Sequence, residues 1–315
     1  MKKFFGLVRL FLYDFIRFYR FSGSLHVTER EQVLAHLVHA YHRVEKGLTM
    51  PRFRAGFGTS AIRMLMKWIR VFEERYGTEE PQLRHAVGVL KGYLDVHHRL
   101  DVPDSMRDML GAIEEFCAAR PYAEMIEQPT VSRADFFKFR NASFPEFAHS
   151  RHTLRHYAGV VEPERIQSAV RLAQSAPSAC NRQPIRVYCL SSREKIEGMM
   201  AIQGGNRGFG TDCDKLLVVT ADLHSGNWIA ERNSLHFDAG LFTMNLCYAL
   251  HYQEVAHCIL NWSTTVATDK QAHALLGIPP HEEIEILIAC GRPAESFKVP
   301  CSPRRPLEEI YRTLD

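Results

Sequence analysis

The most informative stretch of the sequence is Ala176-Pro-Ser-Ala-Cys-Asn-Arg-Gln-Pro184. Before it, Pro163 opens a predicted helix that carries its apolar residues on one face and ends at Pro177. After it, the run 185–190 is short and largely apolar, which predicts a strand. The stretch therefore joins a helix to a strand.

The chain from Ser150 onward alternates between helical and strand patterns. A long helix is predicted over 230–250, and beyond His236 it is apolar on all sides, which predicts burial in a core or in a subunit interface. The predicted strands are Ile185–Leu190, Leu216–Thr220, Val255–Leu260 and Ile284–Ala289. The second half of the chain is therefore α+β or α/β, without repeats or low-complexity tracts.

The first half of the chain is predicted to be helical. Between residues 29 and 119, apolar residues recur at helical spacing in three stripes. A loop over 46–58, rich in glycine and basic residues, follows the first stripe, and residues 121–147 form a connector with little periodicity. Three-residue spacing puts His36, His39, His42 and Glu45 near one another, but one helix cannot close a metal site alone. A polar helix face is the favoured interpretation, and no metal ligand is assigned.

Residues 1–21 form a basic amphipathic pattern. Lys2, Arg9, Tyr13, Arg17 and Arg20 gather on one side of a helical wheel, and aromatic and aliphatic residues such as Phe4, Phe11 and Phe15 gather on the other. Charges interrupt the apolar run and no small-residue cleavage site follows, so it is neither a signal peptide nor a span. Two interpretations stay open: the helix lies on an anionic membrane surface, or it docks on its own protein or a dimer mate.

Composition excludes several classes of protein. The chain has 315 residues, 46% of them hydrophobic, which is enough for a sizeable core. A formal charge of +3 and the lack of a basic stripe argue against nucleic acid as a partner. The eight cysteines include no CxxC pair and several lie in apolar runs, which indicates buried thiols in a reducing compartment. The expected location is the cytoplasm, peripheral to the inner membrane if the N-terminal helix meets lipid.

Three further segments of the second half carry polar side chains suited to a ligand. They are Arg151-His-Thr-Leu-Arg155, Asn261-Trp-Ser-Thr-Thr265 and Ser302-Pro-Arg-Arg-Pro306. Together with Ala176–Pro184, in this order and spacing, they resemble the nitroreductase family. That family opens its domain with Arg-Arg/His-Ser/Thr-x-Arg/Lys-x-Phe/Tyr, continues with Ala-Pro-Ser-x-x-Asn-x-Gln-Pro, and finishes with Gly-x-Pro and a basic tail. The resemblance runs from about Ser150 to the C-terminus, half of the chain.

The resemblance implies an α+β, nitroreductase-like FMN-binding fold: a central, mostly antiparallel sheet flanked by helices, here behind an all-α N-terminal extension. The expected organisation is an amphipathic helix over 1–22, a helical region over 23–147 and the FMN-binding domain over 148–315. The loop around 42–58 is also similar to an extension of nitroreductase-like proteins from bacterial surface-polysaccharide gene clusters. The alternative for that loop is a lid or dimer brace of the flavin domain.

By the same resemblance, specific residues hold FMN. A phosphate dianion suits guanidinium and amide or hydroxyl donors, and Arg151, His152 and Arg304 stand at those positions. Thr153 corresponds to the residue that bonds the ribityl chain or the pyrimidine edge of the ring. Pro177, Ser178 and Asn181 correspond to a tight turn that frames the flavin, commonly at the dimer interface.

Arg155 corresponds to the cation beside flavin N1 and the C2 carbonyl, where it would stabilise the charge of the reduced ring. Asn206, in the loop Gly204–Gly208, is expected to reach the same polar edge. Thr264 and Thr265 align with the segment that faces flavin N5, where many relatives have an acidic residue or glycine.

The expected activity is that of an FMN-dependent oxidoreductase, a homodimer in which NADH or NADPH reduces FMN and an organic acceptor then reoxidises it at the same face. Nitro compounds, quinones, enones or a molecule of glycan biosynthesis are the acceptor classes considered. No protein nucleophile or acid–base pair is required, since the cofactor supplies the chemistry. The alternative is an FMN-binding scaffold or redox sensor whose helical half binds a partner.

Overall fold

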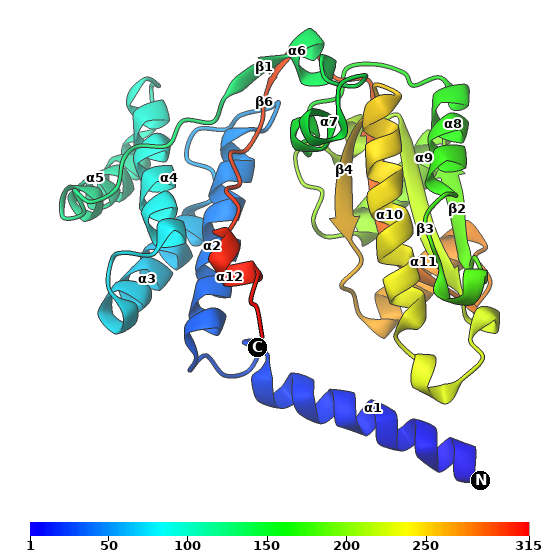
Figure 1. The fold of residues 1–315 in the computed structure, drawn as a ribbon. Coiled ribbons are helices and arrows are strands. Elements are labelled where there is room, and N and C mark those ends of the chain that lie inside the picture. Colours follow the sequence, from blue (N-terminus) through cyan, green and yellow to red (C-terminus); the bar gives the residue numbers. More distant parts are fainter. Residues whose placement is uncertain (315) are drawn as a thin grey trace. The chain divides into compact units, whose positions relative to one another are not determined.

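The computed structural model describes residues 1–314 and divides into two compact units (Figure 1). Unit 1 contains Met1–Leu10 and Thr130–Phe297. Unit 2 contains Phe11–Pro129 and the described residues from Lys298 onward. The predicted α+β class with a helical N-terminal region is confirmed.

A four-stranded antiparallel sheet forms the centre of unit 1. Its strands are β2 (Ile185–Leu190), β3 (Lys215–Asp222), β4 (Ala256–Asn261) and β5 (Glu282–Gly291), in the spatial order β2-β3-β5-β4. Each predicted strand is observed within two residues of its expected ends. The central strands β3 and β5 are buried over most of their length, which explains the continuous apolar runs Leu216–Val219 in β3 and Ile286–Cys290 in β5.

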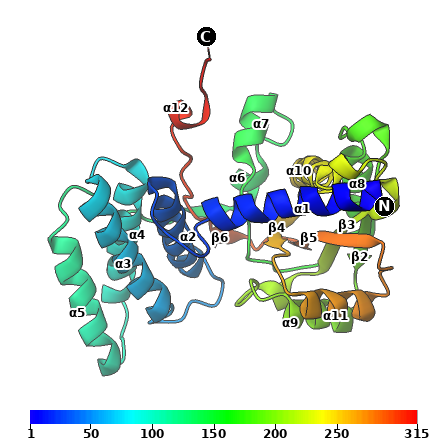
Figure 2. The same cartoon turned by 90° about the horizontal axis from the view of Figure 1, so that it is seen from below.

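Helices cover both faces of this sheet (Figure 2). On one face lie α8 (Pro163–Ala173) and α10 (Ser234–Tyr252), and on the other lie α9 (Arg193–Ile202) and α11 (Val266–Leu276). Leu217 and Val219 of β3 pack with Leu246 and Leu250 of α10 in one apolar cluster. Short 3-10 turns connect the elements; they are η1 (Ala179–Asn181), η2 (Gly210–Asp212), η3 (Leu223–Ser225) and η4 (Ile229–Glu231).

The predicted connector over 121–147 contains short elements of its own. The strand β1 (Thr130–Ser132) pairs with β6 (Ser296–Lys298) in a two-stranded sheet. The helices α6 (Arg133–Phe137) and α7 (Phe144–Ser150) follow. They are too short to show helical periodicity in the sequence, and α7 is marked instead by its Ser143–Glu146 capping box.

Unit 2 is built on four helices: α2 (Arg30–Leu48), α3 (Thr59–Tyr76), α4 (Pro81–His98) and α5 (Asp104–Ala118). Their core residues share complete or nearly complete burial; examples are Leu34, Leu37, Ile62, Leu65, Ile69, Phe72, Leu90 and Tyr93. The chain beyond α5 crosses α4 at Gly88 and Gly92. A Cβ atom at Gly92 would lie 2.1 Å from the carbonyl oxygen of Ile126, so this crossing requires glycine.

The first helix, α1 (Lys2–Phe21), has no buried residue. Within residues 1–314, no helix is both long and apolar enough to cross a membrane. The described part of the chain from Lys298 includes α12 (Leu307–Ile310) and belongs with the helices of unit 2, whereas the sequence analysis assigns it to the FMN-binding domain. The domain limits at 22/23 and 147/148 remain predictions.

Helix α10, predicted to be buried in a core or in a subunit interface, is partly exposed in this chain. Phe237 is 67% exposed and Met244 is 40% exposed. Together with Phe144, Leu241 and Tyr248 they line an apolar groove on the surface of unit 1. The apolar sequence on all sides of this helix is therefore explained only in part by the core of one chain.

Candidate functional site

The segment 151–157 is fixed by the edge of the central sheet. The backbone N–H of Leu154 donates to the carbonyl of His257 in β4 at 3.0 Å. The buried hydroxyl of Tyr157 lies 2.9 Å from the carbonyl of Leu154 and 3.1 Å from that of Ala289 in β5. Leu154 and Tyr157 point into the core, and Arg151, Thr153 and Arg155 remain half-buried.

Arg155 is a cation for which the described residues provide no ion-pair partner. Its Nε and Nη1 atoms are buried and have no hydrogen-bond partner among residues 1–314. Its guanidinium carbon lies 5.8 Å from the centre of the Phe209 ring. Buried donors on a charged group are costly when unpaired, so Arg155 is a position that an anionic or carbonyl-bearing ligand would satisfy.

Arg151 faces two buried histidines. Burial first, and then His257 and Arg151, lower the pKa of His251 to about 3. Burial, and then Arg151, lower the pKa of His257 to about 4, against the opposing effect of a bond to the Val255 carbonyl. Both histidines are therefore neutral at pH 7, and Arg151 is the cation of this group.

The hydrogen bonds of these histidines fix their tautomers. The Ser150 hydroxyl donates to the carbonyl of Phe147 at 2.8 Å, so it accepts from Nε2–H of His251 at 3.0 Å. The Nδ1–H of His257 donates to Val255 at 3.1 Å. In the described structure, Nδ1 of His251 and Nε2 of His257 are left as buried acceptors without a donor.

The stretch around Pro177 forms a strained turn. Cys180, Asn181 and Gln183 all have positive φ, at 51°, 56° and 51°, which costs free energy for residues other than glycine. Two bonds hold the turn: the Ser178 hydroxyl accepts from the Gln183 N–H at 3.0 Å, and the Asp238 carboxylate accepts from the Ala179 N–H at 3.0 Å and 3.1 Å. Pro177 and Asn181 are exposed, as a ligand-framing turn requires.

Asp238 was not singled out by the sequence analysis. It is only 3% exposed and lies on α10 beneath the turn. The signal available in the sequence is a single carboxylate in an otherwise apolar stretch of helix. With Pro177 and Ser178 it lines a cavity of about 170 Å³.

Asn206 lies in a compact loop after α9. Its Nδ2 donates to the carbonyl of Met200 at 2.7 Å and to Gln203. Both amide hydrogens are thus used within the loop, and only Oδ1 is left to meet a flavin, as an acceptor.

Thr265 is the N-cap of α11, and its hydroxyl accepts from the Thr268 N–H at 3.2 Å. Thr264, next to it, is exposed. The Thr265 hydroxyl therefore already caps α11, and the Thr264 hydroxyl is the more available of the two to face flavin N5.

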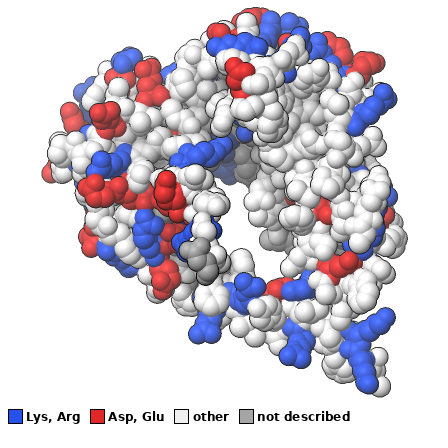
Figure 3. Space-filling model, viewed as in Figure 1, with Lys and Arg blue, Asp and Glu red and all other residues white. Residues whose placement is uncertain are grey.

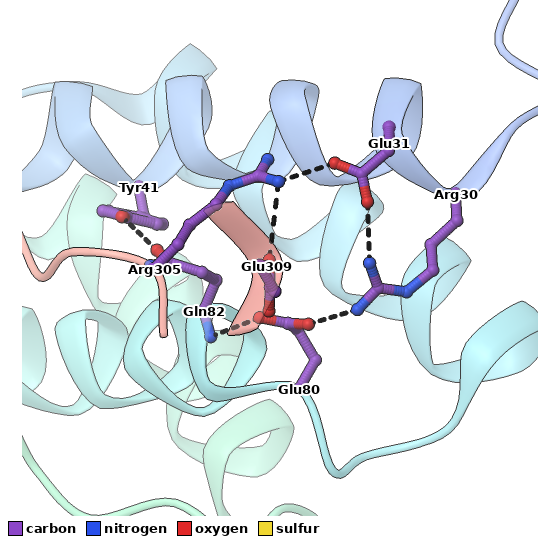
Figure 4. Close-up of polar contacts among 7 residues, drawn as sticks. All are labelled: Arg30, Glu31, Tyr41, Glu80, Gln82, Arg305 and Glu309. Carbon is purple, nitrogen blue, oxygen red and sulfur yellow. Dashed lines mark hydrogen bonds and ion pairs between the residues drawn. The ribbon is translucent and has the colours of Figure 1, made fainter. Parts of the chain in front are cut away.

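Arg304 lies in the C-terminal segment of unit 2. This segment is attached to α2 by polar contacts. Ser302 donates its N–H to the buried carboxylate of Glu45 at 3.3 Å, and Arg305 pairs with Glu31 at 2.7 Å; Figure 4 shows the second of these contacts. Arg304 itself is exposed and donates to the carbonyl of Ser302 at 2.9 Å. Arg151 belongs to unit 1, so these two predicted phosphate ligands lie in different units.

The helix considered as a metal site uses its polar residues otherwise. His36 stacks on Trp68 and bonds the carbonyl of Gly23, and His85 bonds Glu45 at 2.7 Å. Elsewhere, two groups have ligand atoms within 4.8 Å of one another: Asp222, His224 and His281, and His236, Glu283 and Glu285. Unit 1 has another cavity, of about 560 Å³, whose lining includes Arg133, Arg165 and Arg292. None of the residues predicted to bind FMN lines it.

Comparison with known proteins bears on this arrangement. Residues 148–203 match the model of the Nitroreductase family. This part of the chain is nitroreductase-like. The matched range contains both the Arg151–Tyr157 and the Ala176–Pro184 motifs, so the resemblance inferred from them is confirmed. The match ends before Asn206 and before the segments at Asn261 and Ser302.

Several solved structures are similar to part of this chain. A nitroreductase family protein from Streptococcus pneumoniae is 21% identical with a TM-score of 0.47, over 55% of this chain and 100% of that one. An FMN-dependent nitroreductase from Clostridium difficile is 19% identical with a TM-score of 0.42, over 47% and 87%. A protein from Desulfovibrio desulfuricans crystallised in complex with FMN is 22% identical with a TM-score of 0.46, over 54% and 96%. No curated protein matches the chain.

Proposed function

We propose that this protein is an FMN-dependent oxidoreductase that takes electrons from NADH or NADPH and passes them to an organic acceptor. The observation that carries the proposal is Arg155, a half-buried guanidinium inside a motif of the nitroreductase family, two of whose donors have no partner in the described part of the chain. When bound, FMN supplies the electron-transfer chemistry. The task of this chain is to bind the cofactor, orient it and set the polarity around it.

The residues of unit 1 fit the polar parts of FMN. Arg155 would face N1 and the C2 carbonyl, where its buried donors favour the negative charge of the reduced ring. Arg151, with His152 and Thr153 beside it, would hold the phosphate and the ribityl chain. The turn of Pro177, Ser178 and Asn181, supported from below by Asp238, would frame the ring.

Three further residues are proposed with narrower roles. Asn206 would accept from the pyrimidine edge of the ring through Oδ1, because its Nδ2 is used inside the loop. Thr264, more than Thr265, would present a hydroxyl toward N5. Arg304 is proposed as a second phosphate ligand, on the strength of its place in the family pattern.

We also propose that the protein is a homodimer. The apolar groove of Phe144, Phe237, Leu241, Met244 and Tyr248 supports this, since a second copy covering it would account for the apolar surface of α10. The proposed acceptors are the classes considered from the sequence: nitro compounds, quinones, enones or a molecule of glycan biosynthesis.

Steady-state oxidation of NADH and of NADPH tests the function. The purified protein, supplied with FMN, is expected to oxidise one of them in the presence of a quinone or nitroaromatic, and Arg155→Met is expected to slow that turnover. An FMN-binding scaffold or sensor, the second candidate, would bind FMN tightly and give no turnover with any acceptor. Turnover that is unchanged when FMN is removed would contradict both.

A further inference from the structure

The N-terminal helix α1 presents an apolar surface that nothing within the described chain covers. Its residues are exposed or half-buried and none is buried. The aromatic residues stand out: Phe4 is 65% exposed, Phe15 63% and Phe18 66%. Water-exposed aromatic rings in this number need a partner to be stable.

Most of the exposed apolar residues form one continuous arc, and Phe21, 65% exposed, lies outside it. At 100° per residue, Phe4, Phe11, Phe15 and Phe18 lie close together, with Val8, Leu12, Ile16 and Tyr19 beside them, so the arc takes about half of the circumference. The half-buried residues Gly6, Leu7, Leu10 and Asp14 lie on the side of the helix outside this arc. The contacts that α1 makes within the chain therefore leave the aromatic arc free.

The opposite arc is basic. The helix carries five basic side chains, Lys2, Lys3, Arg9, Arg17 and Arg20, against the single acid Asp14. Figure 3 shows several Lys or Arg side chains along the lower edge of the view, where Figure 1 places α1. Arg17 lies 5.3 Å from the ring centre of Tyr13 on this side, so the arc contains aromatic as well as charged groups.

We infer that α1 binds in the plane of an anionic lipid surface. An apolar arc of aromatic and aliphatic residues opposite a basic arc is the pattern by which helices insert shallowly between headgroups, while the cations meet anionic phosphates. An acidic protein or nucleic acid would engage the basic arc and leave the rings in water. A span is excluded for this helix, which is not apolar enough to cross a bilayer.

The test is vesicle flotation of the full-length protein with phosphatidylcholine alone and with 30% phosphatidylglycerol added. Binding is expected only to the anionic vesicles. It should weaken when salt rises from 0.1 M to 1 M, because the screening length falls from about 10 Å to about 3 Å. Equal binding to both vesicles, or none to either, overturns the inference.

Two matched variants separate insertion from simple charge. Phe15→Asp and Tyr13→Asp introduce the same charge, the first in the apolar arc and the second in the basic arc, and both side chains are exposed, so folding should be preserved. Tyr13→Asp is expected to weaken binding about fivefold, the effect of one charge near the surface. Phe15→Asp should bind at least about tenfold more weakly than Tyr13→Asp, because ring burial is lost as well.

Equal effects of the two variants would show that the rings do not insert. Light scattering of the same proteins tests the other occupant, a second copy of α1. If Phe15→Asp lowers the oligomeric mass while wild-type protein ignores anionic vesicles, the arc is a protein interface and the inference is wrong.

Discussion

Replacing Arg155 by methionine should stabilise the protein without FMN and lower the reduction potential of the bound flavin. In the protein without FMN, the substitution removes two buried donors that have no partner. Relief of their desolvation contributes about 1–3 kcal/mol, and the lost contact with the Phe209 ring offsets about 0.5–1 kcal/mol of it. The variant without FMN should therefore unfold a few degrees higher than wild type, by about 2–4 °C per kcal/mol.

With FMN bound, the same substitution should lower the reduction potential. Losing one hydrogen bond from a charged donor costs about 1.5–3 kcal/mol, and for a two-electron couple about 1.4 kcal/mol corresponds to 30 mV. The potential should fall by about 30–60 mV, with slower reduction by the nicotinamide. Potentiometry with excess FMN measures the potential, and thermal unfolding without FMN measures the stability.

Arg304→Met is the matched control for this experiment. Arg304 is exposed and is proposed to reach the phosphate, remote from the ring. Its loss should weaken FMN retention and leave the potential nearly unchanged. Equal shifts in potential from the two variants, or a destabilised Arg155→Met protein without FMN, would refute the placement of Arg155 beside the ring.

Three other predictions concern unit 1. Asp238→Ala should weaken FMN binding in a fluorescence titration and cost about 1–3 kcal/mol of stability, because it leaves the Ala179 N–H unpaired. Asp238→Asn keeps an acceptor and should weaken binding and stability less. Equal FMN binding by the two variants would contradict the role of the turn. Met244→Asp, in the apolar groove of α10, should give a monomer by light scattering, and Val160→Asp, exposed outside that groove, should remain dimeric. Burial lowers the pKa of His257 to about 4 in the folded protein, from about 6.5 in the unfolded chain. Between these two pH values the unfolded chain binds more protons. Stability should therefore fall as the pH decreases below 6.5, by up to about 1.4 kcal/mol per pH unit. Urea unfolding at pH 7.0 and 5.5 should show a smaller loss for His257→Gln than for wild type, and an identical loss would contradict this.

The sequence was sufficient to predict the strands and long helices of unit 1 and the resemblance of residues 148–203 to nitroreductases. Continuous apolar runs such as 286–290 mark strands buried on both faces, and Pro163 marks the start of its helix in the sequence. These signals are local, because each depends only on residues that are neighbours in the sequence. The two nitroreductase motifs lie in continuous segments, so they are visible without knowing the fold.

Tertiary contacts account for what the sequence analysis missed. Asp238 acts on Ala179, 59 positions away, and Asn206 uses its amide on backbone carbonyls that only the folded loop brings near. The attachment of Ser302 to Glu45 joins the C-terminal segment to helices more than 250 positions earlier. The missing partners of Arg155 are likewise a property of packing, and no pattern in the sequence indicates them.

The most direct test of the central claim is the identity of the flavin in the purified protein. Its visible absorption spectrum should show a bound flavin. The molecule released by denaturation should be FMN in stoichiometric amount, because the chain has no Gly-x-Gly-x-x-Gly loop for the pyrophosphate of a dinucleotide. Release of FAD, or a protein that stays without flavin after incubation with excess FMN, would contradict the account.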